Sequence, residues 1–134
     1  MIAVLDASAA VEVVLQRPMA GQLSRYLSEA DWVVAPTLFV SEVTNVFWKY
    51  QRLTDLSLQD CERGLEQAIA LPDDFIDEHD FFREAFKLSC TLVGHSVYDI
   101  MYLIAARRNN AVLLTLDKKL IRTAKECTIE VAEL

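Results

Sequence analysis

The chain has 134 residues, a length that suits one compact domain, and 53% of them are hydrophobic while only 3 are Gly and 3 are Pro. This composition argues against disorder, and no apolar stretch approaches the roughly 18 residues of a membrane span. The formal net charge of −7 argues against passive duplex binding, which rests on Lys and Arg neutralising phosphates. Met1 to Asp6 carries no basic segment, so we expect no signal peptide and a cytoplasmic protein.

Short apolar runs alternate with helical patterns along the first half of the chain. Ile2 to Leu5 is an apolar, β-branched run typical of a buried strand. A helix is expected over Ser8 to Leu15, with Ser8 or Asp6 as its cap. The next expected elements are a helix over 19–30, a strand over Trp32–Val34 closed by Pro36, a helix over Thr37–Arg52 and a helix over 57–70.

The second half continues the same alternation. Its expected elements are a short strand at Phe75–Ile76, a helix over Phe81–Leu92, a helix from Ser96 to about Asn110, a strand over Val112–Leu116, a Lys-rich helix over Asp117–Glu126 and a final strand over Thr128–Val131. Short strands that alternate with helices imply parallel βαβ units. We therefore predict one domain over residues 1–134, a three-layer α/β/α sandwich with a short, mainly parallel sheet.

Four acidic residues lie in apolar surroundings where a carboxylate is rarely tolerated unless something opposes its charge. Asp6 and Asp117 each follow an expected strand, so both should project into the crevice at the carboxyl ends of the sheet, where ligands of open α/β sheets bind. Glu42 and Asp99 would reach it from helices. Four carboxylates in one place need a divalent cation, and their hard oxygen ligands suit Mg²⁺ or Mn²⁺.

Each acid taken singly also has a purely structural interpretation. The segment Ser96–Asp99 fits a capping box, in which the acid stabilises a helix N-terminus. Asp6 and Asp117 are suitable N-caps for the helices that follow them, and Glu42 could face solvent from its helix. The metal-site prediction therefore rests on the conjunction of the four acids.

Four segments, in order, resemble the signature segments of PIN domains, most closely those of the small VapC-type toxins: Val4–Ala10, Ser41–Asn45, Tyr98–Ala106 and Leu114–Lys119. The resemblance spans the whole chain and implies a Mg²⁺- or Mn²⁺-dependent endoribonuclease. Its acidic metal site would be Asp6, Glu42, Asp99 and Asp117.

The resemblance also implies roles for neighbouring residues. Ser8 and Thr115 match the small hydroxyl residues after the first acid and before the last. Where some members carry a further acid, this chain has Leu120 and Ile121, so the resemblance supplies no ligand for a second metal. Asp6, Asp99 and Asp117 are the expected direct or water-mediated ligands, whereas Glu42 could be a ligand or could orient the attacking water.

Basic and aromatic residues around these segments allow two interpretations each. Lys118 and Lys119 begin a basic run that is either a solvated helix face or a set of contacts to the RNA backbone. His95, beside the Ser96 cap, is either a surface residue or a neighbour of the site. Trp48 and Trp32 are expected to be core or interface anchors rather than stacking platforms.

The resemblance implies protein partners as well as an RNA substrate. A cognate small antitoxin would lay an amphipathic helix into an apolar groove over residues 19–30 and 37–52, with an Arg or Lys placed among the acids. We also expect a homodimer with Trp48, Phe47 or Tyr50 near its interface.

Competing functions are weaker but distinct. A phosphatase of the haloacid-dehalogenase type needs a second acid two residues after the first, and that position is Ser8. A receiver-like domain places its acceptor Asp after a central strand and pairs it with a buried Lys. The remaining alternative is a non-catalytic PIN-like module that binds RNA or a partner without cutting.

Overall fold

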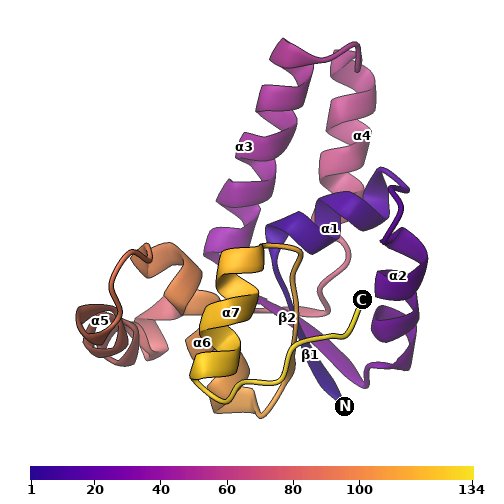
Figure 1. Cartoon of the computed structure of the whole chain (residues 1–134). Coiled ribbons are helices and arrows are strands. Elements are labelled where there is room, and N and C mark those ends of the chain that lie inside the picture. Colours follow the sequence, from indigo (N-terminus) through magenta and orange to yellow (C-terminus); the bar gives the residue numbers. More distant parts are fainter.

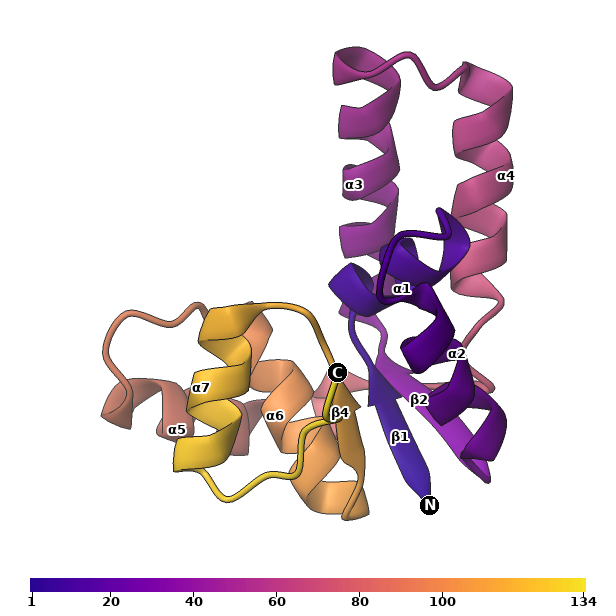
Figure 2. The same ribbon diagram turned by 45° about the vertical axis from the view of Figure 1, so that its right-hand side comes forward.

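A computed structural model describes all 134 residues. The chain folds around a four-stranded, wholly parallel sheet in the order β3-β2-β1-β4 (Figures 1 and 2). Its strands are β1 (Ile2–Leu5), β2 (Trp32–Pro36), β3 (Asp74–Ile76) and β4 (Val112–Leu114). The outermost strands are the last two in sequence, so β1 and β2 occupy the centre and are almost fully buried.

Helices cover both faces of this sheet, as the predicted three-layer sandwich requires. The first group is α1 (Ala7–Val14), α2 (Ala20–Glu29), α3 (Leu38–Leu53) and α4 (Leu58–Ile69), and the second is α5 (Phe82–Thr91), α6 (Val97–Asn109) and α7 (Lys118–Glu126). Successive residues of a strand point to opposite faces. Accordingly Ala3 and Leu5 pack with the first group while Val4 packs with the second.

Side-chain caps fix where several helices begin. The Asp6 carboxylate accepts a hydrogen bond from the backbone N–H of Ala9, so Asp6 rather than Ser8 caps α1. Ser57, Ser96 and Asp117 cap α4, α6 and α7 in the same way. These local signals explain why the expected helices and strands agree with the structure to within a few residues at nearly every boundary.

The C-terminal segment departs from the prediction. The expected strand over Thr128–Val131 is wrong: only a single parallel bridge joins Val131 to Leu113. Thr128 adopts a φ of 59° and donates its backbone N–H to the carbonyl of Lys125, which closes α7 and turns the chain away from an extended path. A 3-10 turn over Glu78–Asp80 was not predicted either.

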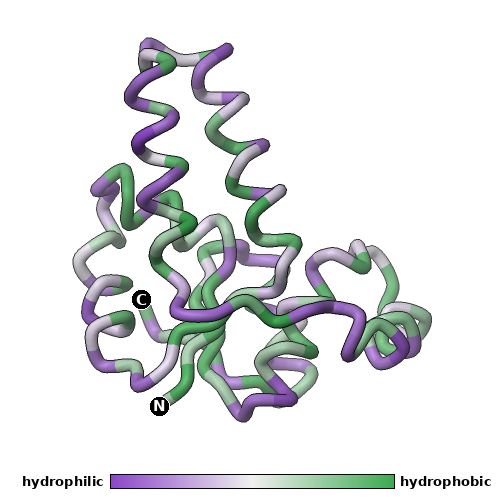
Figure 3. The backbone as a smooth tube through the Cα atoms, turned by 180° about the vertical axis from the view of Figure 1, so that it is seen from behind, coloured by the Kyte–Doolittle hydropathy of each residue, from purple (hydrophilic) through white to green (hydrophobic).

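Helices α3 and α4 form a hairpin that projects from the rest of the molecule (Figures 1 and 2). Gly64 of α4 lies against Phe47 of α3, so close that a Cβ atom at this position would lie 2.6 Å from Cε1 of Phe47. Figure 3 shows hydrophobic segments gathered in the central strands, whereas hydrophilic and hydrophobic stretches alternate along the hairpin. None of the helices has the length and apolar character that crossing a membrane requires.

Candidate functional site

Asp6 is the centre of a buried hydrogen-bond network at the carboxyl edge of the sheet. It follows β1 directly, and its side chain is nearly inaccessible, with 6% of the residue exposed. One carboxylate oxygen, Oδ1, accepts from Ser8 Oγ at 2.6 Å and from Ala9 N at 3.0 Å. The other, Oδ2, accepts from Thr115 Oγ1 at 2.6 Å. Both oxygens of this buried acid are therefore held in place.

Ser8 and Thr115 join the ends of the neighbouring strands β1 and β4. Thr115 is fully buried, and its Oγ1 also accepts the backbone N–H of Asp117 at 3.1 Å. Ser8 Oγ accepts the backbone N–H of Leu116 at 3.0 Å. The two hydroxyl residues thus position the first acid and the backbone that carries the last one.

Asp117 sits at the surface end of this network. Its Oδ1 caps α7 by accepting the backbone N–H groups of Lys119 at 2.9 Å and Leu120 at 3.2 Å. The side chain is exposed, and its charge helps to raise the pKa of Asp6. Capping and proximity to the first acid are therefore compatible roles for Asp117.

Burial dominates the electrostatics of Asp6. Loss of hydration raises the pKa of its carboxyl above the usual value, while the hydrogen bonds from Ser8, Thr115 and Ala9 act in the opposite direction. None of the ion pairs in the structure involves any of the four acids. A buried carboxylate with a strong hydrogen-bond network and no cationic partner favours a ligand that brings positive charge.

Glu42 lies on α3, one turn after that helix begins at the carboxyl end of β2. Its Oε1 accepts a hydrogen bond of 2.8 Å from the hydroxyl of Tyr102 on α6. Desolvation raises the pKa of Glu42 to about 7, the Tyr102 hydrogen bond opposes that rise, and the charges of Asp6 and Asp99 add to it. Glu42 is thus within electrostatic range of two other acids.

Tyr102 was assigned no role by the sequence. It is 1% exposed, and burial, followed by the charge of Glu42, raises the pKa of its phenol, so the hydroxyl stays protonated and donates. Tyr102 lies three residues after Asp99, a spacing that places both on one side of α6. That spacing is the signal which could have identified it.

Asp99 occupies the first turn of α6. Its backbone N–H donates to Ser96 Oγ at 3.3 Å, so the expected cap is present, and the side chain is half-buried. Asp99 and Glu42 both line a cavity of about 440 Å³ between α3 and the start of α6. The acids therefore face one another across an opening in the surface.

The four acids share one neighbourhood without forming a closed cage. Pairwise interactions run from Asp117 to Asp6, from Asp6 to Glu42 and from Glu42 to Asp99. No set of three or more His, Cys, Asp or Glu side chains is close enough to hold a metal ion by itself. The donor set nonetheless fits Mg²⁺, which keeps several waters and is usually bound through one or two carboxylates together with substrate phosphates.

The other residues singled out from the sequence lie around this edge. His95 contacts Thr123 of α7, with Nε2 2.8 Å from Oγ1, rather than any acid. Lys119 donates from Nζ to the backbone carbonyl of Gly94. Lys118 is exposed, directly follows Asp117 in the chain, and lines a cavity of about 540 Å³ that none of the four acids lines.

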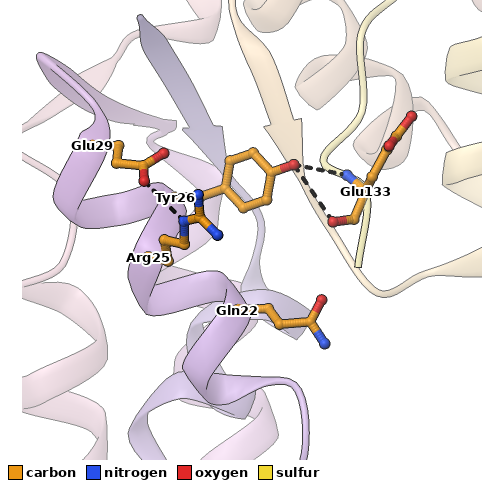
Figure 4. Close-up of a pocket in the computed structure, with 5 residues that line it drawn as sticks. All are labelled: Gln22, Arg25, Tyr26, Glu29 and Glu133. Carbon is orange, nitrogen blue, oxygen red and sulfur yellow. Dashed lines mark hydrogen bonds and ion pairs between the residues drawn. The ribbon is translucent and has the colours of Figure 1, made fainter.

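A separate polar pocket of about 230 Å³ lies between α2 and the C-terminal tail (Figure 4). The Tyr26 hydroxyl accepts the backbone N–H of Glu133 at 3.1 Å, and Arg25 pairs with Glu29 at 2.9 Å. Its polar groups bond to one another and attach the tail to α2, so this pocket has a structural explanation.

Comparison with known proteins identifies relatives. The PIN domain family matches residues 3–126. Two solved structures have the same fold: PAE2754 from Pyrobaculum aerophilum, with a TM-score of 0.72 and 20% identity over 91% of this chain and 84% of that one, and VapBC2 from Rickettsia felis bound to a DNA fragment from their promoter, with a TM-score of 0.69 and 13% identity over 100% of this chain and 99% of that one. The search of curated proteins found no match.

Proposed function

The chain belongs to the PIN domain family, and on that premise we propose that it is a cytoplasmic, Mg²⁺- or Mn²⁺-dependent endoribonuclease, the toxin of a toxin–antitoxin pair. The single observation that carries the proposal is the Asp6 carboxylate, buried at 6% exposure, fully hydrogen-bonded and without a cationic partner. Three further acids lie along one edge with it. Such an arrangement suits a cation and the phosphate that the cation attracts.

The residues of this edge divide the work of holding the cation and the substrate. Asp6, Asp99 and Asp117 would hold the cation directly or through waters, with Ser8 and Thr115 fixing the orientation of Asp6. A bound divalent cation supplies Lewis-acid activation of a water and neutralises charge on the phosphoryl oxygens. Glu42 Oε1 is occupied by Tyr102, which leaves Oε2 to accept a proton from the attacking water.

The basic residues of α7 would orient the RNA. Lys118 is exposed directly after Asp117 and is suited to contact a backbone phosphate, a contact that positions a nucleic acid without reading its sequence. Lys119 lies on the same helix and could add a second contact if its bond to Gly94 is exchanged for one to phosphate. The overall charge of −7 makes such local contacts necessary.

The test is cleavage of RNA by the purified protein with Mn²⁺ or Mg²⁺ and with EDTA. We expect cuts only with the metal, and we expect linear phosphate ends without a 2′,3′-cyclic phosphate because water rather than a ribose hydroxyl attacks. Asp6→Asn should abolish them. Products with a 2′,3′-cyclic phosphate would contradict the mechanism, and RNA binding without any cleavage would favour the non-catalytic alternative.

We further propose a protein partner for the α3–α4 hairpin. Its exposed apolar side chains are Trp48 at 53%, Leu58 at 62% and Leu53 at 79%, whereas Leu23 of α2 is fully buried. The apolar groove is therefore provided by α3 and α4, with little contribution from α2. VapBC2, which shares the fold, is a complex solved on promoter DNA, and this supports a cognate antitoxin for the present chain.

Co-expression with the neighbouring open reading frame tests the antitoxin. We expect a stable complex and relief of toxicity, and an antitoxin Arg or Lys placed among the acids should compete with Mn²⁺. Absence of both complex and relief would exclude the antitoxin.

We also propose a homodimer. Of the three residues expected at its interface, Phe47 is 2% exposed and belongs to the core. Tyr50 is half-buried and its ring is covered by Arg17. Trp48, at 53% exposure, is therefore the most accessible of the three.

A further inference from the structure

The cavity between α3 and α6 has one wall from each helix. Residues 38, 41, 42 and 45 follow the spacing i, i+3, i+4, i+7 and so share one face of α3. The first turn of α6 supplies the opposite wall. The side chains that matter are Ser41, Glu42, Asn45, Ser96, Tyr98 and Asp99. A volume of about 440 Å³ falls within the range of about 300–1,000 Å³ for small-ligand sites.

Apart from the acids that would hold a cation, these walls carry no group suited to bind a phosphate directly. No Lys or Arg lines the cavity, and two carboxylates, Glu42 and Asp99, do. The other polar groups are neutral: the amide of Asn45 offers two N–H donors and a carbonyl acceptor, and the serine hydroxyls offer both functions. A neutral, flat ligand with donors and acceptors on its edge fits this set better than an anion.

Tyr98 supplies a flat apolar surface at the same place. It is 68% exposed, and no hydrogen bond or aromatic contact in the structure engages its ring. Tyr102, one turn later on α6, is 1% exposed and bonded to Glu42. The ring of Tyr98 is therefore accessible to a ligand, whereas the ring of Tyr102 is not. Base–aromatic stacking is the main way in which proteins hold unpaired bases.

We propose that this cavity binds one unpaired base of single-stranded RNA, stacked on the Tyr98 ring, with the Asn45 amide bonded to the edge of the base. The inference rests on the proposed ribonuclease function and names the residues that would hold a base beside its cleavage site. Because Glu42 and Asp99 line the same cavity, the bound base belongs to a nucleotide beside the scissile phosphate. A base inside a duplex is stacked on both sides and cannot enter this site.

Steady-state kinetics on a labelled single-stranded RNA 20-mer of mixed sequence, with Mn²⁺, test the role of Tyr98. Tyr98→Ala is expected to raise KM roughly five- to twentyfold with little change in kcat, because stacking holds substrate and transition state alike. Tyr98→Phe keeps the ring and should behave as wild type. Phe86→Ala, on α5 and outside the cavity, is the matched control because Phe86 is 65% exposed.

A second test changes the RNA instead of the protein, so it does not depend on whether a variant folds. A set of 20-mers, each with one abasic position, should show one position near the cleavage site where removal of the base raises the wild-type KM by the same factor. In Tyr98→Ala that abasic position should have no further effect, because the two changes remove one contact. Asn45→Ala should broaden the range of bases found beside the cleavage site when product ends are sequenced.

The outcomes separate this inference from the function on which it rests. If wild type cleaves the single strand but Tyr98→Ala keeps its KM and no abasic position matters, the base site is wrong and the ribonuclease stands. Equal cleavage of the 20-mer annealed to its complement would also overturn it. Unchanged RNA kinetics with loss of antitoxin binding would assign the cavity to a protein. A wild type that neither cuts nor binds RNA overturns both proposals.

Discussion

The acid-bearing edge of the sheet and the α3–α4 hairpin depart from ordinary globular packing in opposite directions. At the edge a carboxylate, Asp6, is placed inside the protein and held by Ser8 and Thr115. On the hairpin large apolar side chains, Trp48 and Leu58, are placed outside. Buried charge and exposed apolar surface both reduce stability or solubility in isolation.

The two regions are therefore suited to different kinds of partner. The edge offers hard oxygen atoms, and the pKa of Glu42 there is raised to about 7. A bound positive charge would lower that pKa. The hairpin offers an apolar cavity of about 200 Å³ beside Trp48, which another apolar surface would cover. Changes at the edge should therefore alter metal and pH responses, whereas changes on the hairpin should alter association.

Neutralising Asp99 should have the largest effect. Asp99→Asn is expected to lower cleavage roughly 100-fold or more and to remove most of the stabilisation that Mn²⁺ gives the folded protein. In EDTA the variant should be as stable as wild type or more so, because the charge of Asp99 raises the pKa of Glu42. Thermal melts with EDTA and with Mn²⁺ measure both effects.

A matched control for this variant exists on α4. Asp60 follows the Ser57 cap as Asp99 follows Ser96, with its backbone N–H 3.0 Å from Ser57 Oγ, and it lies outside the acid edge. Asp60→Asn should cost about 0.3–1 kcal/mol regardless of metal. If Asp99→Asn behaves in the same way, destabilised in EDTA and stabilised by Mn²⁺ as much as wild type, Asp99 serves only the helix N-terminus.

Removing the Thr115 hydroxyl should have the next largest effect. Thr115→Val leaves Asp6 Oδ2 and the backbone N–H of Asp117 without their partner and should lower the free energy of unfolding by roughly 2–3 kcal/mol. Urea denaturation measures it. Thr123→Val changes another buried threonine, whose hydroxyl bonds to a backbone carbonyl and to His95 but to no acid, and should cost about 1 kcal/mol. Equal losses would show that the carboxylate network adds nothing.

Glu42 should give stability a pH dependence with a definite sign. Its pKa is about 7 in the folded protein against an ordinary 4.5, so the folded state binds the proton more tightly, and stability is lost as pH rises through this window. Glu42→Gln should remove that part of the slope, on the order of 1 kcal/mol after solvent screening. Urea denaturation from pH 4 to 8 checks this prediction.

Tyr102→Phe sharpens the same measurement. The Tyr102 hydrogen bond lowers the pKa of Glu42, so its removal should move the upper end of the window to higher pH. An identical pH profile in wild type, Glu42→Gln and Tyr102→Phe would mean that Glu42 is hydrated and ionised as an ordinary surface glutamate.

The smallest effect on folding is expected on the exposed side of the hairpin. Trp48→Glu should change the free energy of unfolding by less than about 0.5 kcal/mol, because Trp48 is 53% exposed. It should nonetheless convert a dimer to a monomer in light scattering at micromolar concentration. Lys49→Glu, at the adjacent exposed position, is the control. A wild-type monomer under these conditions would contradict the proposed dimer.

Local pattern was sufficient for most elements and for part of the site. Strand runs such as Ile2–Leu5 and cap residues such as Ser96 act over a few residues, so they could be recognised from the sequence. The positions of Asp6 and Asp117 followed because residues after parallel strands meet at one edge. The prediction of a final strand over Thr128–Val131 was wrong because the left-handed turn at Thr128 depends on how α7 ends.

Contacts between distant segments could not be predicted in this way. The bond from Tyr102 to Glu42 joins residues 60 apart, and that from Thr115 to Asp6 joins residues 109 apart. Residue type marks Phe47 and Trp48 alike as apolar, whereas in the folded chain Phe47 packs against Gly64 of α4 and Trp48 stays exposed.

Local patterns along the chain were therefore enough to predict the order of strands and helices, the parallel three-layer architecture and the acids that follow two of its strands. Short-range hydrogen bonding, caps and hydrophobic periodicity govern all of these. The folded chain was needed to learn which hydroxyls hold Asp6, that Tyr102 holds Glu42, and that Tyr98 remains exposed beside a cavity. Those features depend on how α3, α6 and the sheet edge pack together, and packing joins residues whose separation along the chain carries no local signal.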